Sequence, residues 1–166
     1  YDLSSLKMII SAAAPLYSDL EKECSERISV PIKQAWGMSE LSPLGTCVPD
    51  DALKPGTGTI GPVCANTEAR IMSLVDNNTS ALSEGEEGEL QIRGPQIMKG
   101  YLNSKKKTAS AMTRTGWLRT GDIAKVDKDG YFYITDRLKE IIKYKGHQVA
   151  PAELESVILS HKLVAD

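Results

Sequence analysis

The feature that most constrains the fold is an apolar run, an amphipathic stretch and a second apolar run between residues 6 and 37. Residues 6–11 are apolar and rich in β-formers, and a turn of small residues follows at 12–15, which predicts a buried strand and a loop. Apolar side chains then recur every four residues, at Leu16, Leu20, Cys24 and Ile28. This spacing predicts an amphipathic helix, which Pro31 ends before a second strand at 32–37. A strand, a helix and a strand in this order predict an α/β unit with a parallel sheet.

The middle of the chain has a different pattern, with short β-like runs separated by glycines. These runs cover residues 68–75, 89–93, 123–126 and 131–135. Asp129-Gly130 between the last two predicts a hairpin. One helix is expected at residues 104–112, with Ser104 as its cap. The pattern predicts an antiparallel sheet or barrel.

A second module is expected to begin near residues 136–139, where the sequence becomes charged. Pro151 suits the first position of a helix, and Glu153 and Glu155 would lie in its first turn, where the helix dipole favours acidic side chains.

Composition excludes several classes of function. The 20 basic and 22 acidic residues give a net charge of -2, so no overall field favours nucleic acid or an anionic membrane. The three cysteines match neither a disulfide framework nor a CxxC metal pair. No apolar run approaches the ~20 residues of a membrane span. We therefore expect an intracellular and most simply a cytoplasmic setting, with peroxisomal targeting and the oligomeric state left open.

The ends of the chain indicate a piece of a longer protein. Tyr1 is not an initiator methionine, and residues 162–166 carry no signal that ends a helix or a strand. We expect an internal fragment.

One motif is misleading. Gly56, Gly58 and Gly61 satisfy the GxGxxG dinucleotide pattern, which requires a strand before it and a helix after it. Pro62 follows directly and no strand pattern precedes, so a loop is predicted instead. Lys105, Lys106 and Lys107 are interpreted as a solvated face rather than an anion site.

Polar residues follow the second predicted strand, where open α/β sheets bind ligands. Gly37 allows the backbone to approach a ligand, Ser39 offers a hydroxyl to a phosphate oxygen, and Glu40 offers a hard oxygen ligand suited to Mg2+. A turn with a solvated glutamate fits the same residues.

Three later segments likewise allow either a ligand-binding or a structural interpretation. Asp122 in Thr-Gly-Asp can accept two sugar hydroxyls or bond to its own turn. Arg137 can bind phosphate or ribose oxygens or form a surface ion pair. Lys143 to Gly146 is a basic loop that can approach a phosphorylated cofactor or remain solvated.

Taken in order, these segments resemble the adenylate-forming superfamily of acyl-CoA synthetases, luciferases and adenylation domains. The resemblance is closest to 4-coumarate:CoA ligase-like members and covers essentially the whole chain. It rests on residues 11–16, 34–40, 88–101, 117–122 and 136–149, which read SAAAPL, QAWGMSE, GELQIRGPQIMKGY, WLRTGD and DRLKEIIKYKGHQV.

The resemblance implies a role for each matching position. The residues expected at the adenine pocket are Ala13, Ala14 and Pro15. Those expected to border the adenine and acyl pockets are Gln34, Trp36 and Gly37, and Met38 belongs to the same cofactor-binding set. Ser39 would contact the phosphates, Glu40 would hold Mg2+, Asp122 would bind the ribose hydroxyls, and Arg137 would bind ribose and phosphate oxygens. Lys139 matches a hinge, and Lys143 and Gly146 would serve the thioester-forming conformation.

The resemblance also implies the fold and the chemistry. Residues 1–137 would be the C-terminal portion of the large AMP-binding domain, with a parallel-sheet piece and a β-barrel-like subdomain, and 138–166 would begin a small α+β domain. The expected reaction joins a small aromatic or fatty carboxylic acid to CoA through an acyl-AMP, with ATP and Mg2+. A carrier-loading adenylation domain and a non-catalytic nucleotide-binding protein are the alternatives.

Two substitutions and two absences qualify that expectation. Ala12 stands where the family commonly has glycine, and Ser39 where it more often has threonine. The family's phosphate loop and adenylating lysine would lie outside residues 1–166, so this polypeptide alone is expected to be inactive.

Overall fold

The computed structural model of the protein describes residues 2–14, 16–50, 58–75, 80–140, 142–144, 147–149, 151–159, 161 and 163–164. In chain order, the elements are β1 (Ile9–Ser11), α1 (Ser18–Ile28), β2 (Ile32–Gly37), the 3-10 helix η1 (Ser39–Leu41), β3 (Leu44–Cys47), β4 (Glu68–Met72), β5 (Gly88–Arg93), α2 (Lys105–Ala111), β6 (Leu118–Val126), β7 (Phe132–Arg137), β8 (Ile142–Tyr144), β9 (His147–Val149) and α3 (Pro151–Leu159).

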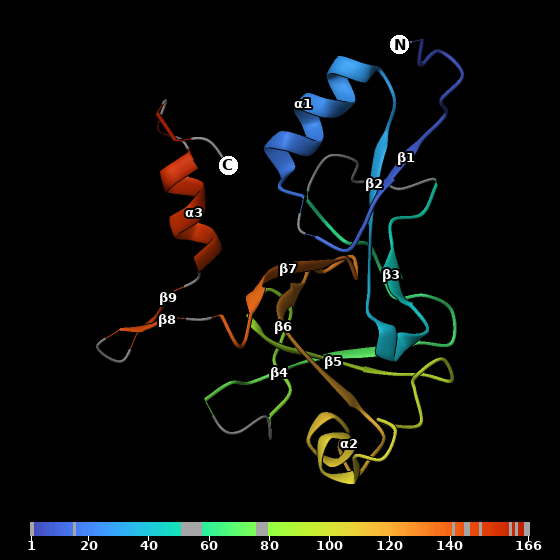
Figure 1. Ribbon diagram of the computed structural model, residues 1–166, viewed down its shortest axis with the longest axis vertical. Coiled ribbons are helices and arrows are strands. Elements are labelled where there is room, and N and C mark those ends of the chain that lie inside the picture. The colour runs from blue at the N-terminus through green and yellow to red at the C-terminus, as the bar shows by residue number, and fades with distance from the viewer. Residues whose placement is uncertain are drawn as a thin grey trace.

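The first unit is a three-stranded sheet in the order β1-β2-β3, with α1 connecting its first two strands (Figure 1). β1 and β2 are parallel, with Ile9 opposite Ile32, which confirms the α/β prediction. β3 runs antiparallel to β2 and was not predicted, because four residues without an apolar alternation carry no strand signal.

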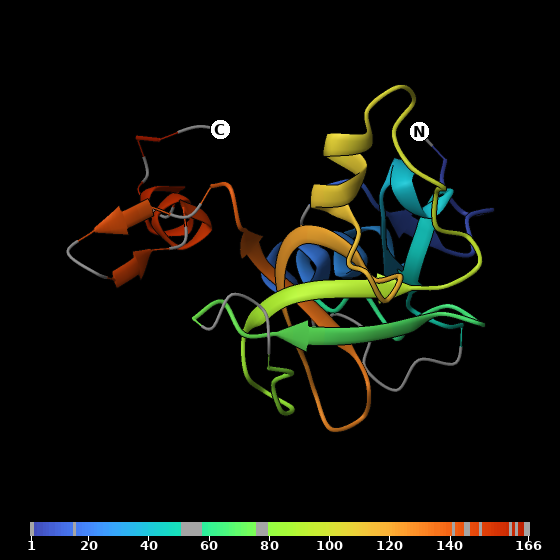
Figure 2. The ribbon, with the colours of Figure 1, turned by 90° about the horizontal axis from the view of Figure 1, so that it is seen from below.

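The second unit is an antiparallel sheet in the order β4-β5-β6-β7, as predicted for the middle of the chain. Figure 2 shows its curvature, with β6 and β7 arching behind β4 and β5. The hydrophobic core lies inside this curve and contains Leu41, Ile60, Ile71, Leu90, Ile92, Leu118, Ala124 and Phe132. Leu41 comes from η1, so the core also anchors the segment that follows β2.

The strand β6 begins at Leu118, five residues before the predicted start at residue 123. Thr120, Gly121 and Asp122 therefore lie within the strand rather than at its beginning. The pairing of β6 with β5 is irregular here, because Glu89 lies opposite Ile123 while Gln91 lies opposite Arg119. This bulge interrupts the two-residue period from which a strand is recognised in a sequence.

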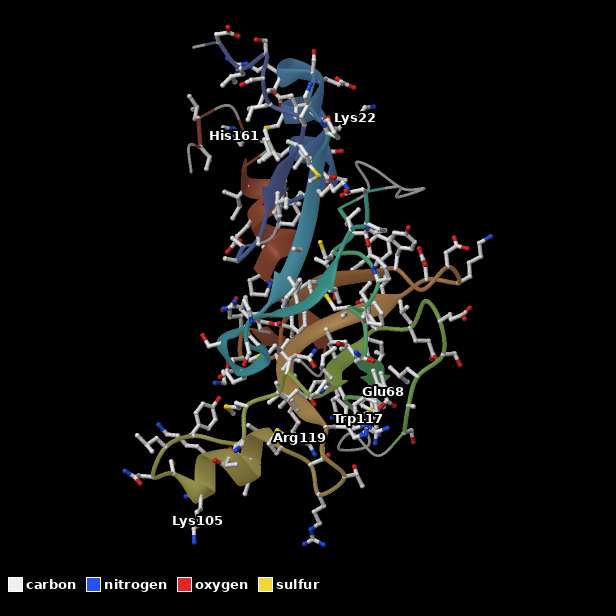
Figure 3. The ribbon with its side chains drawn as sticks, turned by 90° about the vertical axis from the view of Figure 1, so that its right-hand side faces the viewer. Lys22, Glu68, Lys105, Trp117, Arg119 and His161 are labelled. Carbon is white, nitrogen blue, oxygen red and sulfur yellow. The ribbon has the colours of Figure 1, made fainter. Side chains whose placement is uncertain are left out.

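The outer face of the sheet carries a set of mutually paired polar side chains. Arg93 pairs with Glu68 at 2.6 Å, Arg119 with Glu89 at 3.4 Å, and Arg70 donates to Gln91 at 2.7 Å. The guanidinium groups of Arg70 and Arg93 lie 4.3 and 4.6 Å from the centre of the Trp117 ring. Figure 3 shows Glu68, Trp117 and Arg119 on this face, with Lys105 farther away on α2. Two of the three guanidinium groups on this face are paired with carboxylates, and that of Arg70 is bonded to the neutral amide of Gln91.

Helix α2 lies at the opposite end of the molecule from α1 (Figure 1). It was predicted with a Ser104 cap, but the Ser104 side chain makes no capping hydrogen bond. Instead, the backbone oxygen of Ser104 accepts from the backbone nitrogen and the hydroxyl of Thr108. The motif that mimics a dinucleotide turn is a loop over Gly58 to Gly61, while Gly56 lies outside the described residues.

The last elements follow the turn after β7 and lie to one side of the two sheets (Figure 2). β8 and β9 form a two-stranded antiparallel sheet, and α3 begins at Pro151 as predicted. The domain boundary at residues 137/138 stays a prediction. Within the described part of the chain, no helix is long and apolar enough to cross a membrane.

Candidate functional site

The loops after β1 and β2 form one edge of the parallel pair. Carboxyl ends of parallel strands meet at the same edge of a sheet, where open α/β sheets bind ligands. Ala13 and Ala14 are exposed in the first loop, and Pro15 lies outside the described residues. Ala13 has a φ of 74°, so Ala13 takes the left-handed conformation in this turn. Ala12, which stands where the family commonly has glycine, does not take this conformation.

The side chain of Gln34 is buried in β2 and faces α1. Its amide nitrogen donates to the backbone oxygen of Leu16 and to Oε2 of Glu21, both at 2.8 Å. Glu21 is 4% exposed and also accepts from the backbone nitrogen of Gly58 at 3.2 Å. Gln34 thus links β2 to α1 and to the glycine loop. Sequence reasoning missed Glu21, because helical periodicity marks apolar positions rather than a buried acid.

Trp36, Asp122 and Arg137 come together from three strands. The indole Nε1 of Trp36 donates to Oδ2 of Asp122 at 2.9 Å, and Nε of Arg137 lies 3.6 Å from Oδ1 of Asp122. Asp122 and Arg137 are direct neighbours in the β6–β7 register. The side chain of Asp122 is 14% exposed and that of Arg137 is 62% exposed. A carboxylate and a guanidinium therefore meet at one accessible point.

The protonation of Asp122 is set by opposing effects. Burial raises the pKa of this carboxyl, while the hydrogen bond from Trp36 and the charge of Arg137 lower it, and Glu140 raises it. Burial is the largest effect, so the pKa of Asp122 lies above its ordinary value of 3.8.

Thr120 and Gly121 hold the backbone of Asp122 in place. The Thr120 hydroxyl donates to the Leu90 backbone oxygen at 2.7 Å and accepts from the Asp122 backbone nitrogen at 3.0 Å. Gly121 has a φ of 75°, and its oxygen accepts from the Leu138 nitrogen at 2.8 Å. The bulge is therefore held on both sides, which fixes the backbone of Asp122.

The segment after β2 is tightly folded against the following loop. A Cβ on Gly37 would collide with the backbone oxygen of Pro43, so only glycine fits here. The same oxygen accepts from the Met38 nitrogen at 2.9 Å, and the Met38 side chain packs against the core. Ser39 is exposed at the first position of η1. The turn thus exposes Ser39, while Met38 before it is held by the Pro43 oxygen and by the core.

Glu40 contacts a residue that sequence reasoning did not single out. The Tyr101 hydroxyl donates to Oε1 of Glu40 at 2.6 Å, and the Met98 nitrogen donates to the Glu40 backbone oxygen at 2.9 Å. The hydrogen bond to Glu40 raises the pKa of Tyr101, with burial as a smaller cause, so the phenol remains a donor at neutral pH. In the sequence, Tyr101 was marked only as the last residue of the segment 88–101, on which the family resemblance partly rests.

The donor set suits a magnesium ion that is shared with a ligand. In the described part of the chain, no three His, Cys, Asp or Glu residues are grouped to hold a metal. Glu40 offers a carboxylate next to the exposed Ser39 hydroxyl. Mg2+ is commonly bound by one or two carboxylates together with substrate phosphates, so these residues fit it.

The remaining predicted residues lie beyond β7. Lys139 is exposed in the turn directly after this strand. Lys143 belongs to β8, where it pairs with Gln148 through the backbone. The Lys143 side chain and all of Gly146 lie outside the described residues.

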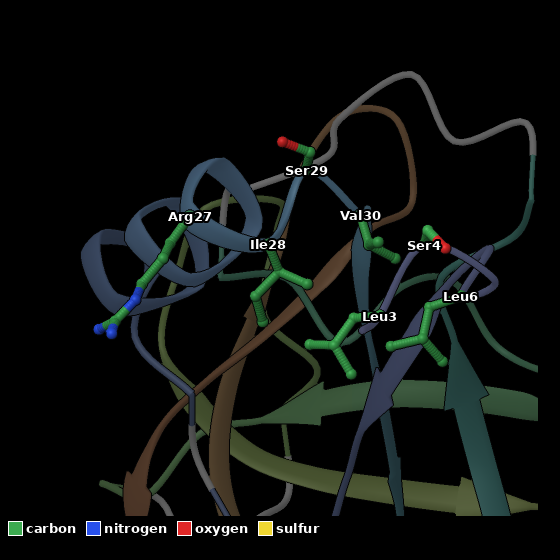
Figure 4. A pocket seen from close by; sticks show the side chains of 7 residues that line it. All are labelled: Leu3, Ser4, Leu6, Arg27, Ile28, Ser29 and Val30. Carbon is green, nitrogen blue, oxygen red and sulfur yellow. The ribbon is translucent and has the colours of Figure 1, made fainter. Parts of the chain in front are cut away.

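A surface hollow is lined by none of these residues (Figure 4). It is formed by the start of the chain and the end of α1, and it is lined by Leu3, Ser4, Leu6, Arg27, Ile28, Ser29 and Val30. These side chains offer one cation and no carboxylate, so the hollow carries none of the chemistry described above.

The chain matches the model of a known protein family. Residues 1–102 fit the model of a family described as "AMP-binding enzyme".

Curated relatives match along the entire chain. Probable 4-coumarate--CoA ligase 1 of Dictyostelium discoideum is 46% identical over 168 residues, and 4-coumarate-CoA ligase 1 of Narcissus pseudonarcissus is 44% identical over 171 residues. All of this chain is covered in both alignments, against 30% and 31% of these two relatives. The chain therefore spans about a third or less of their length.

Solved structures share the fold. ATP-bound MatB from Rhodopseudomonas palustris is 31% identical with a TM-score of 0.87, covering 95% of this chain and 31% of that one. O-succinylbenzoate coenzyme A synthetase (MenE) from Bacillus subtilis, in complex with AMP, is 30% identical with a TM-score of 0.83, covering 98% and 33%.

Proposed function

Because this chain belongs to the AMP-binding enzyme family, we propose that the full-length protein is an ATP-dependent carboxylate:CoA ligase. Family membership confirms the resemblance drawn from the ordered sequence segments, and the fold agrees with the C-terminal part of the large domain. The proposed reaction forms an acyl-AMP and pyrophosphate, then an acyl-CoA and AMP. The names of the relatives favour an aromatic, 4-coumarate-like acid over a fatty acid.

The observation that carries the proposal is the position of Asp122 between Trp36 and Arg137. A carboxylate that is held by an indole N–H has lone pairs left for the two hydroxyls of a ribose. The exposed Arg137 guanidinium, 3.6 Å from Asp122, binds ribose or α-phosphate oxygens in this proposal. ATP-bound and AMP-bound neighbours support this choice of ligand.

The edge formed by the β1 and β2 loops supplies the rest of the nucleotide site in this proposal. Ala13, Ala14 and Pro15 line the adenine pocket in this proposal, and residues 34–37 border the adenine and acyl pockets, with Met38 in the same cofactor-binding set. Ser39 donates its hydroxyl to a phosphate oxygen. Since the Gln34 side chain is bonded to α1, Gln34 acts by positioning this wall.

Magnesium is part of the proposal through Glu40. When it is bound, the ion neutralises charge on the phosphates during adenylation. Glu40 contributes one carboxylate oxygen, and Ser39 lies beside it. A MenE structure that contains ATP and a magnesium ion supports the choice of metal.

The thioester step is assigned to residues beyond β7. Lys139 is the proposed hinge between the units 1–137 and 138–166, and Lys143 and Gly146 serve the CoA-dependent conformation. The proposed setting is intracellular, consistent with the free cysteines Cys24, Cys47 and Cys64. A peroxisomal OPC-8:0-CoA ligase is among the relatives, so a peroxisomal site belongs to the proposal as an alternative to the cytoplasm.

Pyrophosphate release by the full-length protein tests the proposal. With ATP, Mg2+, CoA and a panel of aromatic and fatty carboxylic acids, we expect acid-dependent release and an acyl-CoA product. Asp122→Ala should abolish release, whereas Asp129→Ala, at the hairpin turn of the same strand pair, should not. Residues 1–166 alone should release none.

Other outcomes identify the alternatives. Pyrophosphate release without acyl-CoA, but with acylation of a phosphopantetheine carrier, identifies a carrier-loading adenylation domain. Nucleotide binding without release for any acid identifies a non-catalytic protein.

A further inference from the structure

The contact between Tyr101 and Glu40 has the geometry of a strong hydrogen bond. The two oxygens are 2.6 Å apart, within the short range of hydroxyl–carboxylate bonds, although the residues are 61 positions apart in the chain. Only Oε1 of Glu40 takes part. Among the residues that the structure describes, Oε2 has no hydrogen-bond partner. The carboxylate is therefore held at one oxygen and open at the other.

Both partners are fixed through their backbones as well. The Met98 nitrogen donates to the Glu40 backbone oxygen at 2.9 Å, which ties the loop before Tyr101 to η1. The Tyr101 nitrogen donates to the Thr108 hydroxyl at 2.9 Å. The phenol and the carboxylate thus approach each other from two anchored segments.

Gly100 makes the Thr108 contact possible. Its φ is 147°, and a Cβ there would lie 2.7 Å from Cγ2 and 2.8 Å from Oγ1 of Thr108. Any larger residue would push Thr108 away from the Tyr101 nitrogen. The Gly-Tyr pair therefore places the phenol, and the helix α2 supports it.

We propose that Tyr101 is a positioning residue that orients the Glu40 carboxylate, leaving Oε2 free to bind a divalent cation. The inference rests on the proposed function, since it needs a metal–nucleotide complex at Glu40. A glutamate side chain has several rotatable bonds, and fixing one oxygen lowers the entropy lost when the other binds metal. Groups that orient metal ligands in this way typically affect metal affinity 10- to 100-fold.

A direct metal-binding measurement tests the role without relying on turnover. Mn2+ serves as the probe in the full-length protein saturated with ATP, with free and bound Mn2+ distinguished by electron paramagnetic resonance. Tyr101→Phe removes only the hydroxyl. Tyr133→Phe is the matched control, since the Tyr133 hydroxyl donates to Asp127 at 3.1 Å. Gly100→Ala is a second variant, which displaces the phenol while retaining its hydroxyl.

The expected result is an approximately tenfold or larger rise in the Mn2+ Kd for Tyr101→Phe. Gly100→Ala should shift it in the same direction and Tyr133→Phe should not. The affinity for AMP without metal should stay unchanged in all three variants. In turnover, the KM for Mg2+ should rise in Tyr101→Phe while the KM for the carboxylic acid does not.

Three results would overturn the inference. An unchanged Mn2+ Kd in Tyr101→Phe leaves the proposed function intact and rejects the positioning role. Equal losses of affinity for Mn2+ and for metal-free AMP would show that the Tyr101–Glu40 hydrogen bond only stabilises the local fold and does not orient a metal ligand. If the wild-type protein binds no Mn2+ with ATP, the metal part of the proposed function fails and this inference fails with it.

Discussion

The indole nitrogen of Trp36 donates to Asp122 at 2.9 Å across 86 positions of the sequence. Trp36 belongs to β2 of the parallel pair and Asp122 to β6 of the antiparallel sheet. This bond therefore joins the two units of the fold at the point where Arg137 also meets Asp122. It couples the packing of the units to the geometry of the proposed ribose site.

Trp36→Phe tests this coupling. The change keeps an aromatic ring and removes the donor, and a hydrogen bond to a charged group contributes about 1.5–3 kcal/mol. We expect a loss of that size in the free energy of unfolding and a weaker affinity for ATP, measured by urea unfolding and calorimetric titration of the full-length protein. Trp117→Phe is the control, because the Trp117 indole nitrogen has no hydrogen bond within the described chain. Equal losses of ATP affinity in both variants would contradict the coupling.

Asp122 should give ATP binding and stability opposite dependences on pH. Its pKa is raised in the folded protein, chiefly by burial, so the folded state holds this proton at pH values where the unfolded state has released it. The free energy of unfolding should therefore fall as pH rises from the unfolded pKa, about 3.8, through the folded pKa. ATP affinity should instead rise over this window, since ribose hydroxyls require the ionised carboxylate as acceptor.

Asp122→Asn removes both contributions, and titrations of unfolding and of ATP binding against pH measure them. Trp36→Phe should move the midpoint of the binding profile upward, because the indole hydrogen bond lowers the pKa of Asp122. A pH profile of Asp122→Asn identical to that of the wild type would assign the dependence to another group.

The sequence predicted those parts of the molecule that depend on local periodicity. The four-residue repeat through Leu20 and Cys24 located α1, and Asp129-Gly130 located the β6–β7 hairpin. The start of β6 was missed because the bulge around Gly121 breaks the alternation. Contacts such as Glu21 with Gln34 and Tyr101 with Glu40 join distant positions, and no local pattern marks them. The nucleotide roles of the site residues stay predictions.

Ala13→Gly should stabilise the protein. Ala13 has a φ of 74°, and the left-handed region costs an L-residue with a Cβ about 1–2 kcal/mol. Glycine removes this strain but loses more backbone entropy on folding, so we expect a net gain of up to about 1 kcal/mol in urea unfolding. Ala12→Gly, at a neighbouring position without positive φ, should instead cost about 0.4–1 kcal/mol. The same sign of change in both variants would reject the assignment of strain to Ala13.

Glu21→Ala should destabilise the protein more than substitutions at exposed positions of α1 do. Glu21 is 4% exposed and accepts from the Gln34 amide and the Gly58 nitrogen, so its loss leaves one buried and one half-buried donor without this acceptor. An unsatisfied buried polar group costs about 1–3 kcal/mol, and we expect a loss within that range in urea unfolding, because the Gln34 amide keeps its bond to the Leu16 oxygen. Glu23→Ala, on an exposed position of the same helix, has the same effect on helix propensity without this burial and should change stability by less than about 0.5 kcal/mol. Because Gln34 lies two residues before Trp36 in β2, the released amide should also weaken ATP binding. A variant that loses stability but binds ATP normally would separate the Glu21 network from the nucleotide site.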